Sequence, residues 1–138
     1  MSMFCFQCQE TAKGIGCTIS GVCGKTDKVA NMQDLLIFVL KGISIYSTKA
    51  RSLGIETDEV NRFVVESLFM TITNANFDHD RFVTRIQEGL RLRDRIKSEY
   101  LNAGGKLPSV LHESATWSGN SVEELAAKNI SVGVLSEK

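Results

Sequence analysis

Apolar residues recur every three or four positions between Met32 and Ala50, the spacing that places side chains along one face of an α-helix. Additional apolar residues widen this face, so we expect the helix to be buried on more than one side. Asn31 is the expected N-cap, and Gly54 stands where a left-handed residue commonly ends a helix. The pattern predicts a central helix over residues 32–50.

Two further helices are predicted downstream. The first is expected after Thr57, a good N-cap, and the second after Asp78, with its end at the Gly104–Gly105 pair. Between them, TNANFD is expected to be a turn, because Asn and Asp side chains compete with helical backbone hydrogen bonds. The apolar face of the first of these helices consists of Val60, Phe63, Val64, Leu68 and Thr71.

The polar face of the helix after Asp78 is rich in basic residues with acidic residues interspersed. We expect this face to be solvated or to dock against the rest of a longer chain, because it has few of the aromatic residues of a nucleic-acid surface. Its basic residues are Arg81, Arg85, Arg91, Arg93, Arg95 and Lys97.

The C-terminal third lacks a sustained period and begins with a predicted loop. The residues expected to hold this loop down are Leu107, Leu111 and Trp117. Ser121 and Glu124 match a capping box that starts a short helix to about Lys128, and ISVGVL after it is expected to be a short strand or an exit segment. Together the elements predict an all-α fold, an antiparallel bundle of about three main helices and a short fourth. Residues 1–30 form a Cys-rich loop and residues 31–138 the bundle, within one domain.

Length and charge narrow the range of functions. The 138 residues suffice for one domain with a hydrophobic core, and Lys plus Arg equal Asp plus Glu at 16 each, which gives no basic field for nucleic acid. No uninterrupted apolar run reaches the roughly 18–20 residues of a membrane helix, and the N-terminus lacks the features of a secretory signal. We therefore expect a cytoplasmic protein that binds neither nucleic acid nor a membrane.

All four cysteines lie between Cys5 and Cys23, with the spacing C-x2-C-x8-C-x5-C. Disulfides are the least favoured explanation, because thiols stay reduced in the cytoplasm. A structural zinc site usually joins two short knuckles, and only the first pair of cysteines fits that pattern. An iron–sulfur cubane tolerates longer loops between its ligands, because it is wider than a single ion.

Glycines surround the last two cysteines. Glycine lets a chain turn sharply around a bulky cofactor and point backbone N–H groups at its sulfurs, which favours a cluster over zinc. The alternative is that these glycines only make a flexible N-terminal arm. The glycines concerned are Gly14, Gly16, Gly21 and Gly24.

The segment MFCFQCQETAKGIGCTISGVCGKT, from Met3 to Thr26, resembles the N-terminal signature of the hybrid cluster proteins, also called prismane proteins or hydroxylamine reductases. The segments MQDLLIFVLKGISIYSTKARSLG and FMTITNANFD resemble the same family. The resemblance implies reduction of hydroxylamine to ammonia and water, with nitric oxide reduction also proposed, at an iron–sulfur–oxygen hybrid centre. It further implies a nearby cubane, 4Fe–4S in most members and 2Fe–2S in some relatives, whose ligands here are Cys5, Cys8, Cys17 and Cys23.

The chain departs from the family at the hybrid centre, which takes ligands from His, Glu and further Cys residues. No cysteine follows Cys23, and family chains are several times longer. We therefore expect the N-terminal part of a longer oxidoreductase, without catalysis of its own, whose cluster relays electrons from a redox donor protein to the remaining domains. A zinc-stapled helical module for binding or assembly is the alternative.

Three lysines and two phenylalanines lie near the cysteines in the sequence. Lys13, Lys25 and Lys28 are expected either to offset the negative charge of a cluster and raise its potential or to be solvated surface residues. Phe4 and Phe6 are expected either to shield the cluster from water or to anchor the N-terminus to the bundle.

No residue of the chain is assigned a catalytic role. His79 is expected to make a surface hydrogen bond, and His112 with Glu113 resembles a metal pair but is too little for a site, because isolated histidines are usually structural or exposed. A Ser/His/Asp grouping, a phosphate-binding glycine loop and a dinucleotide fingerprint are all absent from the sequence.

Overall fold

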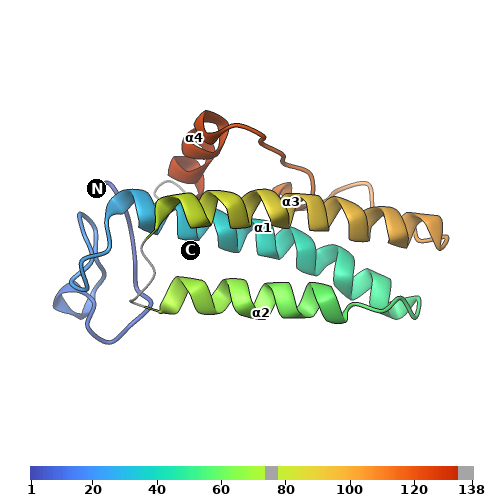
Figure 1. The fold of residues 1–138 in the computed structure, drawn as a ribbon, viewed down its shortest axis with the longest axis horizontal. Coiled ribbons are helices and arrows are strands. Elements are labelled where there is room, and N and C mark those ends of the chain that lie inside the picture. Colours follow the sequence, from blue (N-terminus) through green and yellow to red (C-terminus); the bar gives the residue numbers. More distant parts are fainter. Residues whose placement is uncertain (74–77, 134–138) are drawn as a thin grey trace.

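The computed structural model describes residues 1–73 and 78–133. Three long helices, α1 (Asp27–Ser52), α2 (Asp58–Ile72) and α3 (His79–Asn102), lie along the longest dimension, and consecutive helices run in opposite directions (Figure 1). Helix α4 (Val122–Gly133) packs against α1 on the side opposite α2. Two short 3-10 turns, η1 (Ala12–Gly14) and η2 (Glu113–Ala115), complete the described elements. The predicted all-α bundle is confirmed.

Helix α1 begins earlier than predicted. Its N-cap is Thr26 rather than Asn31, because the Thr26 hydroxyl accepts a hydrogen bond from the backbone N–H of Val29 at 3.3 Å. Asn31 lies inside the helix, where its side-chain amide donates to the backbone carbonyl of Ser2 at 2.9 Å. The predicted end is confirmed, since Gly54 follows the helix with φ +76°.

Helix α1 is the core helix of the bundle. By length and composition alone, α1 is long and apolar enough to cross a membrane. Sequence reasoning counted only uninterrupted apolar runs and did not find this, because Lys41 divides the apolar stretch. Of the most apolar 18-residue stretch of α1, 72% is buried inside the bundle, so the position of α1 in the core accounts for its apolar composition. Fully buried side chains of the core include Leu35, Leu36, Val39, Ile43 and Tyr46 of α1 and Phe82, Ile86 and Ile96 of α3.

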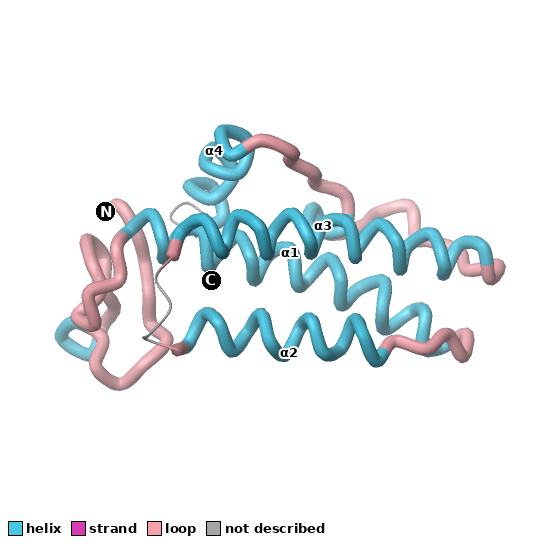
Figure 2. The backbone as a smooth tube through the Cα atoms, in the orientation of Figure 1, coloured by secondary structure: helices cyan, strands magenta, loops and turns pink. Residues whose placement is uncertain are grey.

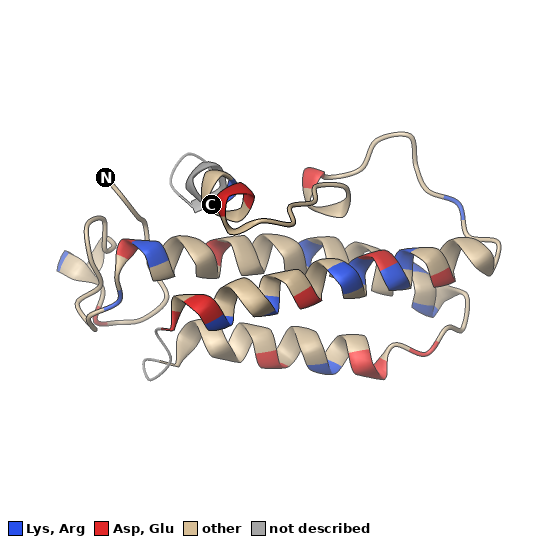
Figure 3. Cartoon of the chain, turned by 45° about the horizontal axis from the view of Figure 1, so that its top comes forward, with Lys and Arg blue, Asp and Glu red and all other residues tan. Residues whose placement is uncertain are grey.

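The loop before α4 closes directly onto α1 and α3. A Cβ atom at Gly42 would lie 2.0 Å from the carbonyl oxygen of Ser114, so this approach of two backbones needs glycine. Arg93 on α3 donates to the same carbonyl at 3.1 Å and is only 2% exposed. The prediction of a wholly solvated or docking basic face is therefore wrong at Arg93, and Arg85 is half-buried, donating to the hydroxyl of Ser67 on α2 at 2.8 Å. Basic and acidic residues are interspersed along α3, as expected (Figure 3).

Helix α2 is less completely covered than predicted. Thr57 occupies the N-cap position, but its hydroxyl accepts from the side chain of Asn61 at 3.3 Å rather than from a helix backbone N–H. Val60 and Thr71 are buried as expected, whereas Leu68 is 43% exposed. The predicted turn that follows falls mainly on residues 74–77, outside the described residues.

The remaining helix ends largely follow their local signals. The Asp78 carboxylate accepts from the N–H of Asp80 at 3.0 Å, and Ser121 and Glu124 form the two reciprocal hydrogen bonds of a capping box, each 3.1 Å long. Helix α4 continues beyond Lys128 to residue 133, so a strand or exit segment is wrong for residues 130–133, and the rest of ISVGVL lies outside the described residues. The predicted anchors of the preceding loop do pack against the core: Leu107, Leu111 and Trp117.

Candidate metal centre

Residues 1–26, the cysteine loop, lie at one end of the bundle beside the C-terminal end of α2 (Figures 1 and 2). Within the loop, Cys5 and Cys17 pair as an antiparallel bridge. The N–H of Cys5 donates to the carbonyl of Cys17 at 3.0 Å, and the N–H of Cys17 donates to the carbonyl of Cys5 at 2.9 Å. Backbone pairing thus brings together cysteines from the two halves of the motif.

A small apolar contact and one amide hydrogen bond hold the cysteine loop on α1. Met3 is fully buried and packs with Cys17 and with Ala30 of α1. Asn31 reaches the backbone of Ser2 as described above. Sequence reasoning missed both anchors, because Met3 stands outside any periodic pattern and Asn31 looked like a helix cap.

Two glycines allow the tight path of the cysteine loop. Gly16 has φ +146°, and a Cβ atom there would lie 2.6 Å from the ring of Phe4. A Cβ atom at Gly21 would lie 3.1 Å from the Sγ of Cys23, so the backbone passes very close to that thiol. These glycines therefore shape the loop around the cysteines, and a flexible arm does not explain them.

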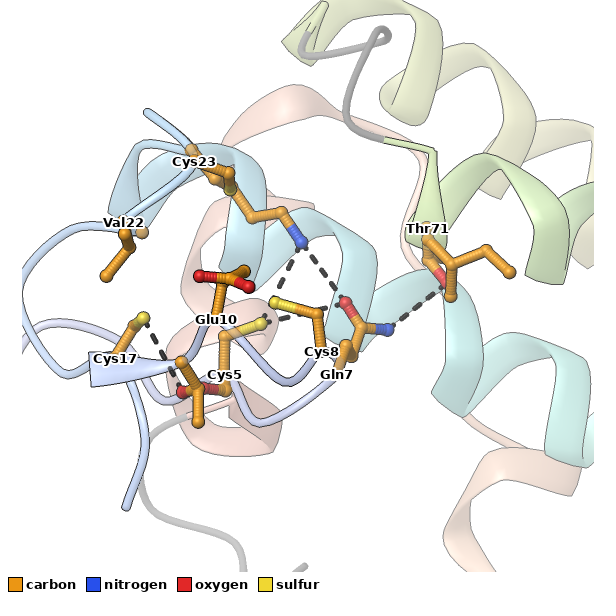
Figure 4. A pocket seen from close by; sticks show the side chains of 12 residues that line it. Cys5, Gln7, Cys8, Glu10, Cys17, Val22, Cys23 and Thr71 are labelled. Carbon is orange, nitrogen blue, oxygen red and sulfur yellow. Dashed lines mark hydrogen bonds between the residues drawn. The ribbon is translucent and has the colours of Figure 1, made fainter. Parts of the chain in front are cut away.

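All four cysteines line one cavity, together with Gln7, Lys25 and Thr71 among others (Figure 4). The cavity holds about 410 Å³ of empty space, part of it open to solvent. All four are free thiols, with Cys17 buried, Cys5 half-buried, and Cys8 and Cys23 exposed. Within residues 1–73 and 78–133, no group of three or more His, Cys, Asp and Glu side chains is arranged to hold a metal ion.

The buried thiol of Cys17 is surrounded by hydrogen-bonding groups. The backbone N–H of Ala12 donates to its Sγ at 3.4 Å, and the hydroxyl of Thr11 lies 3.6 Å away. Hydrogen bonds from the backbone of Ala12 and then of Val22 lower the pKa of Cys17, against burial, which raises it. This environment favours the thiolate, the form of cysteine that binds metals.

Lys25 is the one lysine of the cysteine loop that reaches the thiols. Its ammonium donates to Oε1 of Gln7 at 3.1 Å and lies 3.8 Å from Sγ of Cys5. The side-chain amide of Gln7 donates in turn to the hydroxyl of Thr71 on α2 at 3.3 Å. Sequence reasoning singled out neither Gln7 nor Thr71 for this site, because their proximity depends on how α2 lies against the cysteine loop.

The other residues predicted near the site have different positions. Lys13 and Lys28 are exposed, Phe6 is 57% exposed, and Phe4 is half-buried beside Gly16. Neither histidine lines the cysteine cavity. His79 lies 3.4 Å from a carboxylate oxygen of Asp80, as expected for a surface hydrogen bond, and His112 accepts a hydrogen bond from the N–H of Ser114 at 3.2 Å.

The cysteine loop and the bundle together match one family. The model of the Prismane/CO dehydrogenase family matches residues 3–135. This chain belongs to the prismane/CO dehydrogenase family. The match confirms the family resemblance of the cysteine motif and of the two helical segments, and it extends the resemblance to residue 135.

Several relatives are named hydroxylamine reductase. The chain is 62% identical to the hydroxylamine reductase of Desulfitobacterium hafniense (strain DSM 10664 / DCB-2) and 54% identical to that of Clostridium novyi (strain NT), each over 135 residues. It is 52% identical over 141 residues to that of Halothermothrix orenii (strain H 168 / OCM 544 / DSM 9562). These alignments cover 98–99% of this chain and 25% of each relative, so the chain spans about a quarter of their length.

Proposed function

We propose that this chain is the electron-relay part of a hydroxylamine reductase-like oxidoreductase, with a 4Fe–4S cluster bound by its four cysteines. The observation that supports it best is that all four cysteines line one cavity in a chain of this family. Four thiolates are the donor set of a cubane cluster. The proposed ligands are Cys5, Cys8, Cys17 and Cys23.

The surroundings of the thiols fit such a group. The N–H of Ala12 points at the sulfur of Cys17, and the ammonium of Lys25 lies near the sulfur of Cys5. Hydrogen bonds to sulfur, nearby charge and exposure to solvent are the features by which a protein sets the potential of an iron–sulfur cluster. The residues of the cavity therefore supply both the ligands and the means of tuning them.

When bound, a cluster of this kind supplies one-electron transfer. Reduction of hydroxylamine consumes two electrons and two protons, NH₂OH + 2e⁻ + 2H⁺ → NH₃ + H₂O, so two successive transfers are needed for each turnover. The part of this chain is to hold the ligands in place and keep water from Cys17. No cysteine remains after Cys23 for a hybrid centre, so we propose that the chain by itself does not reduce hydroxylamine.

The proposed partners are the remaining domains of the longer enzyme and a redox donor protein. We propose a cytoplasmic location without binding to nucleic acid or a membrane. The equal numbers of basic and acidic residues and the burial of α1 in the bundle support this proposal.

The decisive test is the iron and acid-labile sulfide content of this chain, purified or reconstituted without oxygen. We expect about four of each per chain and a broad absorption band at about 400 nm that bleaches on reduction. The reduced chain is expected not to consume hydroxylamine.

A matched pair of variants tests the ligand assignment. Cys8 is exposed, so Cys8→Ser is expected to remove most of the iron and sulfide while leaving the helices intact, whereas Thr18→Ala in the same loop is expected to retain both. One zinc per chain without sulfide would refute the proposal and favour the zinc-stapled module.

A further inference from the structure

Lys25 carries a buried positive charge in the cysteine loop. Lys25 is only 3% exposed. Among the residues that the structure describes, no carboxylate oxygen lies within 4 Å of its ammonium nitrogen. Burial of a charge is costly unless an opposite charge or hydrogen bonds compensate for it. The two groups in contact with the ammonium are the amide oxygen of Gln7 and the sulfur of Cys5. Glu10 also lines this cavity, but among the described residues it forms no ion pair with Lys25. The negative charge nearest to the ammonium is therefore that of Cys5 when its thiol is deprotonated.

Burial separates Lys25 from the other lysines close to the cysteines in sequence. Lys13 and Lys28 are exposed, so water screens their charges. The ammonium of Lys25 lies in the cavity that all four cysteines line, where the charge is screened much less. Of these three lysines, Lys25 alone has the position from which a fixed charge acts strongly on the thiol site.

A chain of hydrogen bonds holds Lys25 in that position. Gln7 lies between Cys5 and Thr71 (Figure 4), accepting from Lys25 with its oxygen and donating to Thr71 with its nitrogen. The hydroxyl of Thr71 donates to the carbonyl of Leu68 at 2.8 Å, which ties the chain to α2. The position of the ammonium is thus determined by α2 as well as by the cysteine loop.

We infer that Lys25 is the positioning and counter-charge residue of the cysteine site, and that it raises the reduction potential of the bound cluster. This inference rests on the function proposed above. Four thiolates give the site a net negative charge, and reduction adds one more electron. A nearby positive charge stabilises the reduced state more than the oxidised state, so removing the charge makes reduction harder.

The test is the midpoint potential of the cluster in this chain, measured for Lys25→Met, Lys25→Gln and Lys25→Arg. Lys13→Met and Lys28→Met are the matched controls. In the two neutral Lys25 variants we expect the equilibrium constant for reduction to fall about tenfold or more, which lowers the midpoint potential by about 59 mV or more for one electron. We expect Lys25→Arg and both controls to change it by less than about twofold.

The outcomes separate this inference from the proposed function. Wild-type chain without iron and sulfide refutes the proposed function, and the inference with it. A cluster whose potential is the same in the wild-type chain and in the neutral Lys25 variants refutes the inference alone. If neither neutral variant assembles a cluster, assembly of a cluster by Lys25→Arg supports the inference that the site needs a positive charge. If Lys25→Arg also fails to assemble a cluster, the inference is refuted.

Discussion

The cysteine loop and the helical bundle are held together by different forces. In the bundle, large apolar side chains of α1 and α3 are fully buried against one another. In the cysteine loop, Met3 and Cys17 are buried beside Ala30, and the path depends on backbone hydrogen bonds and glycine conformations. Because apolar burial is the main favourable term in folding, the bundle is expected to be the stable unit.

The small number of buried apolar residues in the cysteine loop bears on function. Segments with few buried apolar contacts open at low free-energy cost, and sites that bind ligands are often built from them. If the cluster is lost to air, we expect the helices to persist while residues before about Lys25 lose their order. Three substitutions probe this difference.

The largest effect is expected from Phe82→Ala in the core of the bundle. Phe82 is fully buried on α3, so the loss of its ring and the cavity left behind are expected to cost about 3–5 kcal/mol. Urea unfolding followed by far-UV circular dichroism measures the change. The matched control is Phe69→Ala on α2, which is 62% exposed and is expected to change stability by less than about 0.5 kcal/mol. Equal losses in the two variants would contradict the assignment of the stable core.

An intermediate and local effect is expected from Gly16→Val in the cysteine loop. The positive φ and the contact with Phe4 make the substitution unfavourable by about 1–3 kcal/mol, a roughly 5- to 150-fold change in local opening. Faster hydrogen exchange at the amides of Cys5 and Cys17 is the readout, with the urea midpoint of the helices unchanged. Ser20→Val, in the same loop, is the control and is expected to leave exchange at both amides unchanged. A fall in the urea midpoint for Gly16→Val would show that cysteine loop and bundle unfold as one unit.

The smallest effect is expected at the junction of the two regions, from Thr26→Ala. Loss of the hydroxyl that accepts from the N–H of Val29 is expected to cost about 1 kcal/mol of helix stability. Thr26→Ser keeps that hydroxyl and is expected to behave like the wild-type chain. Hydrogen exchange in the first turn of α1 and the urea midpoint measure both. Equal loss in the Ala and Ser variants would assign the effect to the methyl group rather than to the cap.

The bundle was predictable where its signals are local. The apolar period, the Asp78 cap and the capping box at Ser121 all act within a few residues of one another, so sequence reasoning located these elements. Sequence reasoning misplaced the start of α1, because residues 27–31 lack the apolar period and Asn31 resembles an N-cap. In the structure the side-chain amide of Asn31 instead donates to the carbonyl of Ser2. It also missed that Arg93 is buried, because the carbonyl of Ser114 comes from a loop distant in sequence.

The cysteine motif and the glycines around it were sufficient by themselves to identify the family and to nominate all four cysteines, because a ligand motif is a local pattern. They left open which of three nearby lysines lies beside the thiols. Only the tertiary structure decided that, by burying Lys25 between Cys5 and Gln7 and by placing Thr71 of α2 against Gln7. The physical reason is that residue type is written in the sequence, whereas burial and the screening of a charge depend on every element packed around it.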